Sequence, residues 1–159
     1  MEFRRIAAGS AGGALATVAM SGWMLAGQVA TAHGEQPPKR LLRGFAHRAG
    51  MPTNRRGVVT VLATAVAHLG FGSGCGAVYG AVVSRSSAYR GVAFGLGVWA
   101  ISYAGWIPAL DLLPPPHKDR PGRAWTIFTA HVVYGGALGA ALAGYDKAQH
   151  PGSSDKTRA

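Results

Sequence analysis

Long stretches without a charged residue alternate with polar connections along the chain. The uncharged stretches lie at residues 6–32, 57–83, 91–110 and 124–144. A helix needs about 20 mainly apolar residues to cross the hydrocarbon core of a bilayer, so each stretch is long enough for one crossing. The pattern therefore predicts an all-α integral membrane protein, a four-helix bundle in a single transmembrane domain at residues 1–145.

The connections between these helices are polar, and two of them are rich in proline and basic residues. Residues 33–56 contain paired prolines that forbid a regular helix, and the segment after them fits either an amphipathic interfacial helix or a solvated loop. Residues 113–123 form the second such connection. Residues 146–159 are predicted to be a polar, disordered tail.

The first apolar stretch has a second interpretation. A basic pair at residues 4–5, an apolar run and small residues at 30–32 also fit a cleaved secretory signal peptide. However, the run is long for a signal sequence, and Gly9 and Gly13 mark a helix-packing face that a discarded peptide would not need. We therefore expect the first helix to be retained.

A repeated motif relates the second helix to the fourth. Residues 67–77 and 130–140 share the pattern Ala-His-x-x-(Phe/Tyr)-Gly-x-x-x-Gly-Ala, 63 positions apart. A weaker match between Gly-Trp pairs at residues 22–23 and 105–106 relates the first helix to the third, 83 positions apart. The chain is thus predicted to consist of two related transmembrane hairpins of the same orientation, a parallel internal repeat.

Each predicted helix also carries a stripe of small residues, the pattern of a glycine zipper. The stripes are Gly9 and Gly13; Gly72, Gly76 and Gly80; Gly91 and Gly95; and Gly135 and Gly139. Lipid tails give helices no hydrophobic reason to associate, so such stripes act by letting backbones approach closely. They support packing within the bundle and allow a homo-oligomer.

His68 and His131 lie one turn before these stripes, on the same helix faces, so their imidazoles are predicted to point into the bundle. Four roles are open. The pair can lock helix packing by hydrogen bonds, ligate a b-type haem, handle protons or a metal ion, or line the polar path of a small transporter or channel. No acidic residue lies in either helix to assist proton transfer, which weakens the third role. We expect the first role, with no cofactor or metal.

Composition supports the membrane class and limits the alternatives. Of the 159 residues 48% are hydrophobic and 14% charged, against about 25% charged in soluble domains. The net charge of +10 could suggest nucleic acid, but the basic residues lie between and beyond the apolar runs, so the expected partner is the lipid bilayer. A single cysteine, Cys75, excludes an internal disulfide. No catalytic arrangement stands out, and the chain is predicted not to be an enzyme.

Two smaller features complete the prediction. Aromatic residues near the end of the third helix fit an interfacial belt: Trp99, Tyr103 and Trp106. Asp119, in the second proline connection, is expected to pair with Arg120 or Arg123.

Three segments resemble YagU-type bacterial inner-membrane proteins: residues 34–40 (GEQPPKR), 102–123 (SYAGWIPALDLLPPPHKDRPGR) and 130–135 (AHVVYG). The resemblance covers most of the chain and implies a small multi-pass protein of the bacterial inner membrane. That family has no established biochemical activity, so the resemblance implies no catalytic residues. Sequence and resemblance together predict a structural or accessory membrane protein.

The distribution of basic residues predicts the orientation. The two proline connections hold more Lys and Arg near the membrane than the opposite side, which favours cytoplasmic proline connections and outward termini, although the basic pair at residues 4–5 argues the other way. A tag at either terminus should therefore be accessible to an impermeant reagent in intact cells. Protected termini would reverse the predicted orientation.

Overall fold

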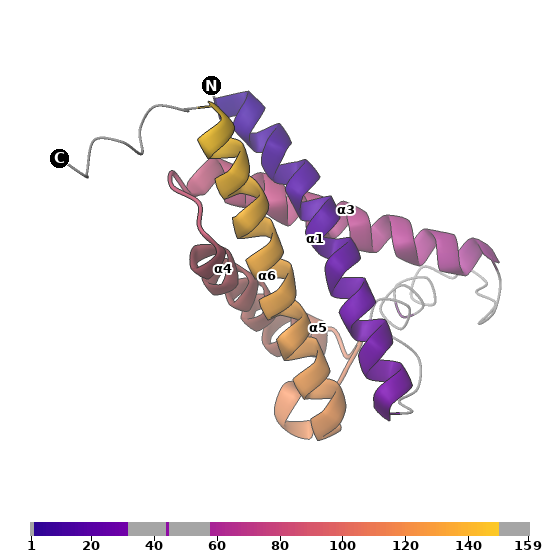
Figure 1. The fold of residues 1–159 in the computed structure, drawn as a ribbon. Coiled ribbons are helices and arrows are strands. Elements are labelled where there is room, and N and C mark those ends of the chain that lie inside the picture. The colour runs from indigo at the N-terminus through magenta and orange to yellow at the C-terminus, as the bar shows by residue number, and fades with distance from the viewer. Residues whose placement is uncertain (1, 32–43, 45–57, 150–159) are drawn as a thin grey trace.

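The computed structural model describes residues 2–31, 44 and 58–149, where the regular structure is entirely helical. The long helices are α1 (Glu2–Thr31), α3 (Val58–Val82), α4 (Ala88–Ile101) and α6 (Pro121–Gln149) (Figure 1). The predicted all-α class is thus confirmed for the described residues. The predicted connection at 33–56, apart from Gly44, and residues 150–159 lie outside them.

Three helical stretches are long and apolar enough to cross a membrane: Val61–Val82, Ala88–Ala109 and Pro121–Gln149. They overlap the second, third and fourth predicted helices. The 30-residue helix α1 is not among these stretches, because small and weakly polar residues lower its hydropathy. At 1.5 Å per residue its length is nevertheless about 45 Å, more than the hydrocarbon core requires.

Three helices extend beyond their predicted ends, and α1 begins at Glu2 rather than at residue 6. Helix α4 begins at Ala88, because the Ser87 side chain caps it by accepting a hydrogen bond from the amide of Arg90. Helix α6 begins at Pro121, which suits a first helical turn, and continues to Gln149. Residues 146–149, predicted as the start of a disordered tail, are therefore helical.

Helix α4 continues through a wider, π-type turn at Ser102–Trp106 into the short helix α5 (Ile107–Ala109). Pro108 has no amide hydrogen to donate to the carbonyl one turn earlier, which disrupts the regular helix here. Gly105 takes φ −107° and ψ −105°, outside the helical range. Wider turns of this kind are frequent at functional sites, and this one carries residues that line the cavity described below.

The helices pack in two pairs, α1 with α3 and α4 with α6, and α1 also packs on α6 (Figure 1). Helices α3 and α4 barely touch. Between α1 and α3 the backbones meet directly: a Cβ added to Gly76 would collide with the carbonyl oxygen of Gly9 and with the amide nitrogen and Cα of Gly13. The glycines predicted to form stripes on these two helices therefore face one another.

The same atomic contacts recur between α4 and α6. A Cβ added to Gly139 would meet the carbonyl oxygen of Ser87 and the amide nitrogen and Cα of Gly91, the same three atoms that Gly76 meets on α1. Gly76 and Gly139 are 63 positions apart, as in the repeated motif. On the first helix of each pair, Gly13 and Gly91 hold equivalent positions in these contacts. They are 78 positions apart, so the contacts relate α1 to α4 by 78 positions and correct the shift of 83 drawn from the Gly-Trp pairs.

The two pairs differ at the next turn, where Thr17 stands in the place of Gly95. A Cβ added to Gly95 would collide with the carbonyl oxygen of His131, so α4 and α6 stay in contact at this level. On α1 the Thr17 side chain takes up that space, and its hydroxyl donates to the Gly13 carbonyl at 2.7 Å. Toward its N-terminal end α3 extends past α1 and away from the other helices (Figure 1).

The core lies where α1, α3 and α6 meet. Its buried residues are Ala16, Met20, Met24, Tyr79, Ala130, Tyr134, Leu138 and Leu142. A second, smaller cluster lies under the α4–α5 turn: Tyr103, Ile107, Leu113 and Ile127. The indole of Trp23 adds a polar link between the pairs by donating to the Thr129 hydroxyl at 2.8 Å.

Arg5 ties the first and last helices at the end of the bundle where α1 begins and α6 ends (Figure 1). Its Nε and Nη2 donate to the Asp146 carboxylate at 3.0 and 3.1 Å. Its Nη1 donates to the Gly80 carbonyl at 2.8 Å, and Nη2 also reaches the Ser86 hydroxyl at 3.0 Å. Arg5 thus links α1 to both α3 and α6.

The glycine contacts predict a position-specific effect of adding one methyl group. Gly91→Ala should lower the free energy of unfolding by about 1–3 kcal/mol, because the new Cβ overpacks a backbone contact. Gly97→Ala on the same helix meets nothing within 4 Å and should be neutral or stabilising. SDS titration followed by circular dichroism measures the difference. Gly76→Ala and Gly74→Ala form the matched pair on α3, and equal stability within both pairs would contradict the contacts.

Candidate functional site

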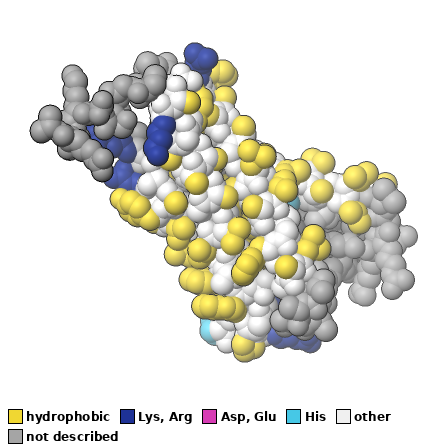
Figure 2. Space-filling view, viewed as in Figure 1, with side chains coloured by type: hydrophobic (Ala, Val, Ile, Leu, Met, Phe, Trp, Pro, Cys, Tyr) yellow, Lys and Arg dark blue, Asp and Glu magenta, His cyan; other side chains and the backbone are white. Residues whose placement is uncertain are grey.

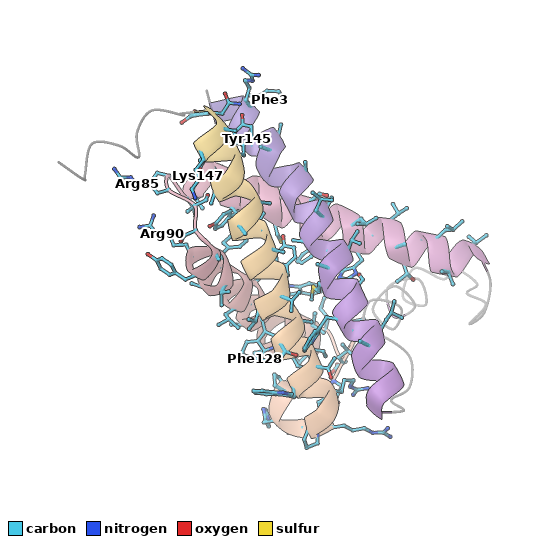
Figure 3. The ribbon with its side chains drawn as sticks, viewed as in Figure 1. Phe3, Arg85, Arg90, Phe128, Tyr145 and Lys147 are labelled. Atoms are coloured by element: carbon cyan, nitrogen blue, oxygen red, sulfur yellow. The ribbon has the colours of Figure 1, made fainter. Side chains whose placement is uncertain are left out.

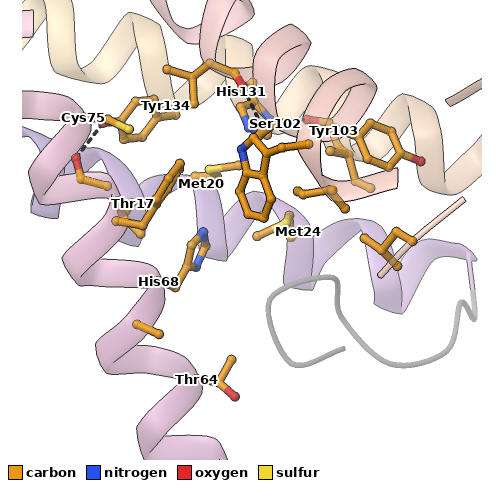
Figure 4. A pocket seen from close by; sticks show the side chains of 18 residues that line it. Thr17, Met20, Met24, Thr64, His68, Cys75, Ser102, Tyr103, His131 and Tyr134 are labelled. Carbon is orange, nitrogen blue, oxygen red and sulfur yellow. Dashed lines mark hydrogen bonds between the residues drawn. The ribbon is translucent and has the colours of Figure 1, made fainter. Parts of the chain in front are cut away.

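A cavity of about 260 Å³ lies between α1, α3, the α4–α5 segment and α6, and it is partly open to the surface (Figure 4). Most of its wall is apolar or aromatic, with Met20 and Met24 from α1, Phe71 from α3 and Trp106 from the α4–α5 turn. The volume lies just below the roughly 300–1,000 Å³ typical of pockets for drug-sized ligands. The space therefore suits a small molecule.

Both histidines of the repeated motif line this cavity (Figure 4). His68 comes from α3 and is half-buried, whereas His131 comes from α6 and is 9% exposed. Both side chains face the same cavity. The structure thus brings together the two residues that the sequence singled out as a pair.

His131 has a fixed tautomer. Its Nδ1 lies 2.8 Å from the carbonyl oxygen of Ile127, one turn earlier in α6. A carbonyl oxygen only accepts hydrogen bonds, so Nδ1 carries the hydrogen and Nε2 of the neutral ring carries a lone pair. The Nδ1 of His68 faces the Ser21 hydroxyl at 3.4 Å, where either group can donate.

The Nε2 atoms of both histidines remain accessible. Within the described residues, the polar side-chain atoms that are buried and without a hydrogen-bond partner are Tyr79 Oη and Trp99 Nε1. Neither histidine nitrogen is among them, and no hydrogen bond to either Nε2 is present in the described part of the chain. A ligand in the cavity can therefore reach both atoms.

The hydrogen bond that joins α3 to α6 beside the cavity comes from a tyrosine rather than from a histidine. The hydroxyl of Tyr134 on α6 donates to the carbonyl oxygen of Gly72 on α3 at 2.7 Å, in a buried position. His131 bonds within its own helix, and His68 faces α1 of its own pair. The two copies of the motif differ at the Phe/Tyr position, where Tyr134 has a hydroxyl that Phe71 lacks. This difference was the signal in the sequence that could have indicated the bond.

Asp119 anchors one wall of the cavity through Tyr103. One carboxylate oxygen accepts from the Tyr103 hydroxyl and from Arg123 Nε at 2.8 Å; the other accepts from the Arg120 amide at 2.7 Å and from Arg123 Nη2. Burial raises the pKa of Asp119, but the hydrogen bonds from Arg123, Tyr103 and Arg120 outweigh burial and hold this pKa below its ordinary value. Arg123 is the expected ion-pair partner, whereas Arg120 contributes its backbone amide.

The predicted aromatic belt is instead an internal cluster. Tyr103 is 1% exposed, and Trp99 and Trp106 pack against the same buried residues. Asp119 draws the Tyr103 hydroxyl inward, and helix periodicity alone did not reveal that partner. Trp125, at 66% exposed, and Trp23, at 48%, are the tryptophans that face outward.

Two further observations limit the chemistry. No group of three or more His, Cys, Asp or Glu residues that could hold a metal ion is present among residues 2–31 and 58–149. Cys75 lines the cavity as a free thiol.

Comparisons with protein-family models, with curated proteins and with solved structures found no match.

The Asp119 cluster predicts a pH-dependent stability. Asp119→Asn should lower the free energy of unfolding at pH 7 by about 1–3 kcal/mol, because charge-assisted hydrogen bonds are lost. Since the folded pKa lies below the unfolded value near 3.9, the ionised carboxylate stabilises the fold above that pH, and this contribution disappears as the pH falls through the folded pKa. Denaturant titration of both proteins from pH 7 to 3 should show the difference shrinking.

Asp111→Asn provides the control, because Asp111 is exposed in the same connection and its φ of 51° is one that asparagine tolerates. A loss of stability in Asp111→Asn as large as in Asp119→Asn would contradict the assigned role.

Proposed function

We propose that this chain is a four-helix integral membrane protein with an accessory, non-catalytic role, and that it binds a small, mainly apolar molecule in the cavity between its two hairpins. One observation carries the proposal. The two histidines of the repeated motif, one from each hairpin, line a single cavity and leave their Nε2 atoms accessible.

The outer surface supports a membrane location. Large hydrophobic side chains are widely exposed, including Val59 at 80%, Ile101 at 71% and Val82 at 68%. In Figure 2 hydrophobic side chains are spread over the length of the visible face, while Lys and Arg gather near its ends. This pattern suits lipid around the middle of the protein and head groups at its ends. With the resemblance to YagU-type proteins, it supports a place in the bacterial inner membrane with α1 as the fourth crossing.

The matching glycine contacts support two related hairpins, α1–α3 and α4–α6. Each unit contains two crossings, so the copies share one orientation and both proline connections lie on one side. The end near the termini also carries basic residues, among them Arg85, Arg90 and Lys147 (Figure 3). Cytoplasmic proline connections are proposed because these hold the larger number of Lys and Arg residues.

The volume of the cavity favours a small ligand over haem. A metal-ligating histidine commonly donates one ring N–H to a carbonyl and binds the metal through the other nitrogen. His131 has this arrangement, because its Nδ1 is bonded to a carbonyl and its Nε2 is free. A tetrapyrrole macrocycle, however, needs far more space than a single ring, and the cavity holds about 260 Å³. The same pair of imidazoles therefore fits a small organic molecule better.

Binding can be detected at Met20 and Met24, which line the cavity. Protein in lipid nanodiscs, with isotope-labelled methionine methyl groups, should show saturable chemical-shift changes when titrated with para-cresol or toluene, because an aromatic ring in the cavity shields nearby methyl groups. Val98→Phe fills the cavity and should abolish the changes. Ile101→Phe adds the same bulk at an exposed position of the same helix and should retain them.

Two results would contradict the proposal. If neither compound shifted the methionine signals, the cavity would not be a binding site. If the purified protein showed a Soret band that disappeared in His68→Ala or His131→Ala, haem would be its ligand instead.

A further inference from the structure

We propose that the cavity selects small ring molecules carrying a hydroxyl group, of which a phenol is the simplest, and that this hydroxyl donates a hydrogen bond to Nε2 of His131. The inference rests on the proposed function and specifies the ligand class of the same site.

The first reason is the chemistry of His131. Its Nδ1 hydrogen is directed at the Ile127 carbonyl, so the neutral ring presents a lone pair at Nε2 and cannot donate there. The side chain is 9% exposed and its Nε2 has no hydrogen-bond partner among the described residues. An accessible acceptor in a mainly apolar cavity gains a hydrogen bond when a ligand supplies a donor. The matching group is a donor.

The second reason is that hydroxyl groups around the cavity already donate their hydrogens to other protein groups. Four hydroxyl side chains line the cavity and donate to backbone carbonyls or to a carboxylate: Thr17 to Gly13, Ser102 to Val98, Tyr134 to Gly72, and Tyr103 to Asp119. Each keeps an oxygen lone pair but has no second hydrogen to offer. The wall is therefore rich in acceptors and poor in donors.

The remaining polar lining residues are Thr64, Trp106, Cys75 and His68. Thr64 and Trp106 each have an interaction partner of their own. Cys75 has a thiol, which is a weak donor. His68 can present either a donor or an acceptor, since its contact with the Ser21 hydroxyl fits both tautomers. It can thus accept from, or donate to, the same ligand hydroxyl.

The third reason concerns the apolar part of the ligand. Two methionines and several aromatic rings line the cavity, and thioether sulfur packs favourably against aromatic rings. An apolar cavity of about 150 Å³ holds benzene, so about 260 Å³ accommodates a substituted single ring. A ring with one hydroxyl group fills this space and supplies a donor to Nε2 of His131.

A set of three compounds with one ring size tests the inference. Para-cresol donates and accepts, its methyl ether only accepts, and toluene does neither. Titrations followed at the methyl groups of Met20 and Met24, with free concentrations corrected by partition into empty nanodiscs, should give about tenfold tighter binding for para-cresol than for its ether. The wild-type protein alone gives this comparison.

Two variants assign the preference to His131. His131→Phe keeps an aromatic ring but removes the acceptor, so cresol and ether should bind with similar affinity. Ile101→Phe changes an exposed position of α4 outside the cavity, so the tenfold preference should persist. The helical circular dichroism of both variants verifies that they fold.

Each alternative result has one meaning. Equal binding of cresol and ether to the wild-type protein would overturn the inference and leave the proposed function intact. Failure of all three compounds to bind would overturn both. A cresol preference that survived in a folded His131→Phe protein would overturn the assignment to His131.

Discussion

Close contact between glycine-bearing helix faces is the constraint on which the rest of this structure depends. Lipid tails are as apolar as helix side chains, so a bundle in a bilayer gains its cohesion from backbone approach and interhelical hydrogen bonds. Gly76 on Gly13 and Gly139 on Gly91 fix the height of each second helix on its first. Because His68 and His131 lie two turns before these contacts, the same constraint also sets the level of both imidazoles.

One departure from the repeated contact creates the site. Gly95 lets α4 stay in close contact with α6. At the equivalent position of α1, Thr17 places a side chain between α1 and α3, and α3 diverges from α1 toward its own N-terminal end. The divergence leaves space beside His68, while His131 stays enclosed at 9% exposure. Tyr134 then holds α6 to Gly72, just above the space. Two helix pairs with matching glycine contacts thus line one asymmetric cavity, with a buried histidine on one wall and a more exposed histidine on the other.

The sequence was sufficient for features that depend on one helix at a time. Long charge-free runs located the four helices to within a few residues, and residues spaced by four identified the faces of α1, α3, α4 and α6 that carry glycine. Features that depend on a partner were missed. The inward position of Tyr103 depends on Asp119, the length of α6 on the bond between Asp146 and Arg5, and the cavity on Thr17 facing Gly72. Each required knowledge of which helices meet and at what level.

The contacts of Arg5 have a consequence for assembly during synthesis. Helices α1 and α3 can pair through their glycines soon after both are made, but the guanidinium of Arg5 receives its carboxylate from Asp146, near the end of the last helix to emerge. Before that, the partners available to the arginine among the described residues are the Gly80 carbonyl and the Ser86 hydroxyl. The first helix of the chain therefore completes its contacts last, and the bundle closes only when nearly the whole polypeptide has been translated.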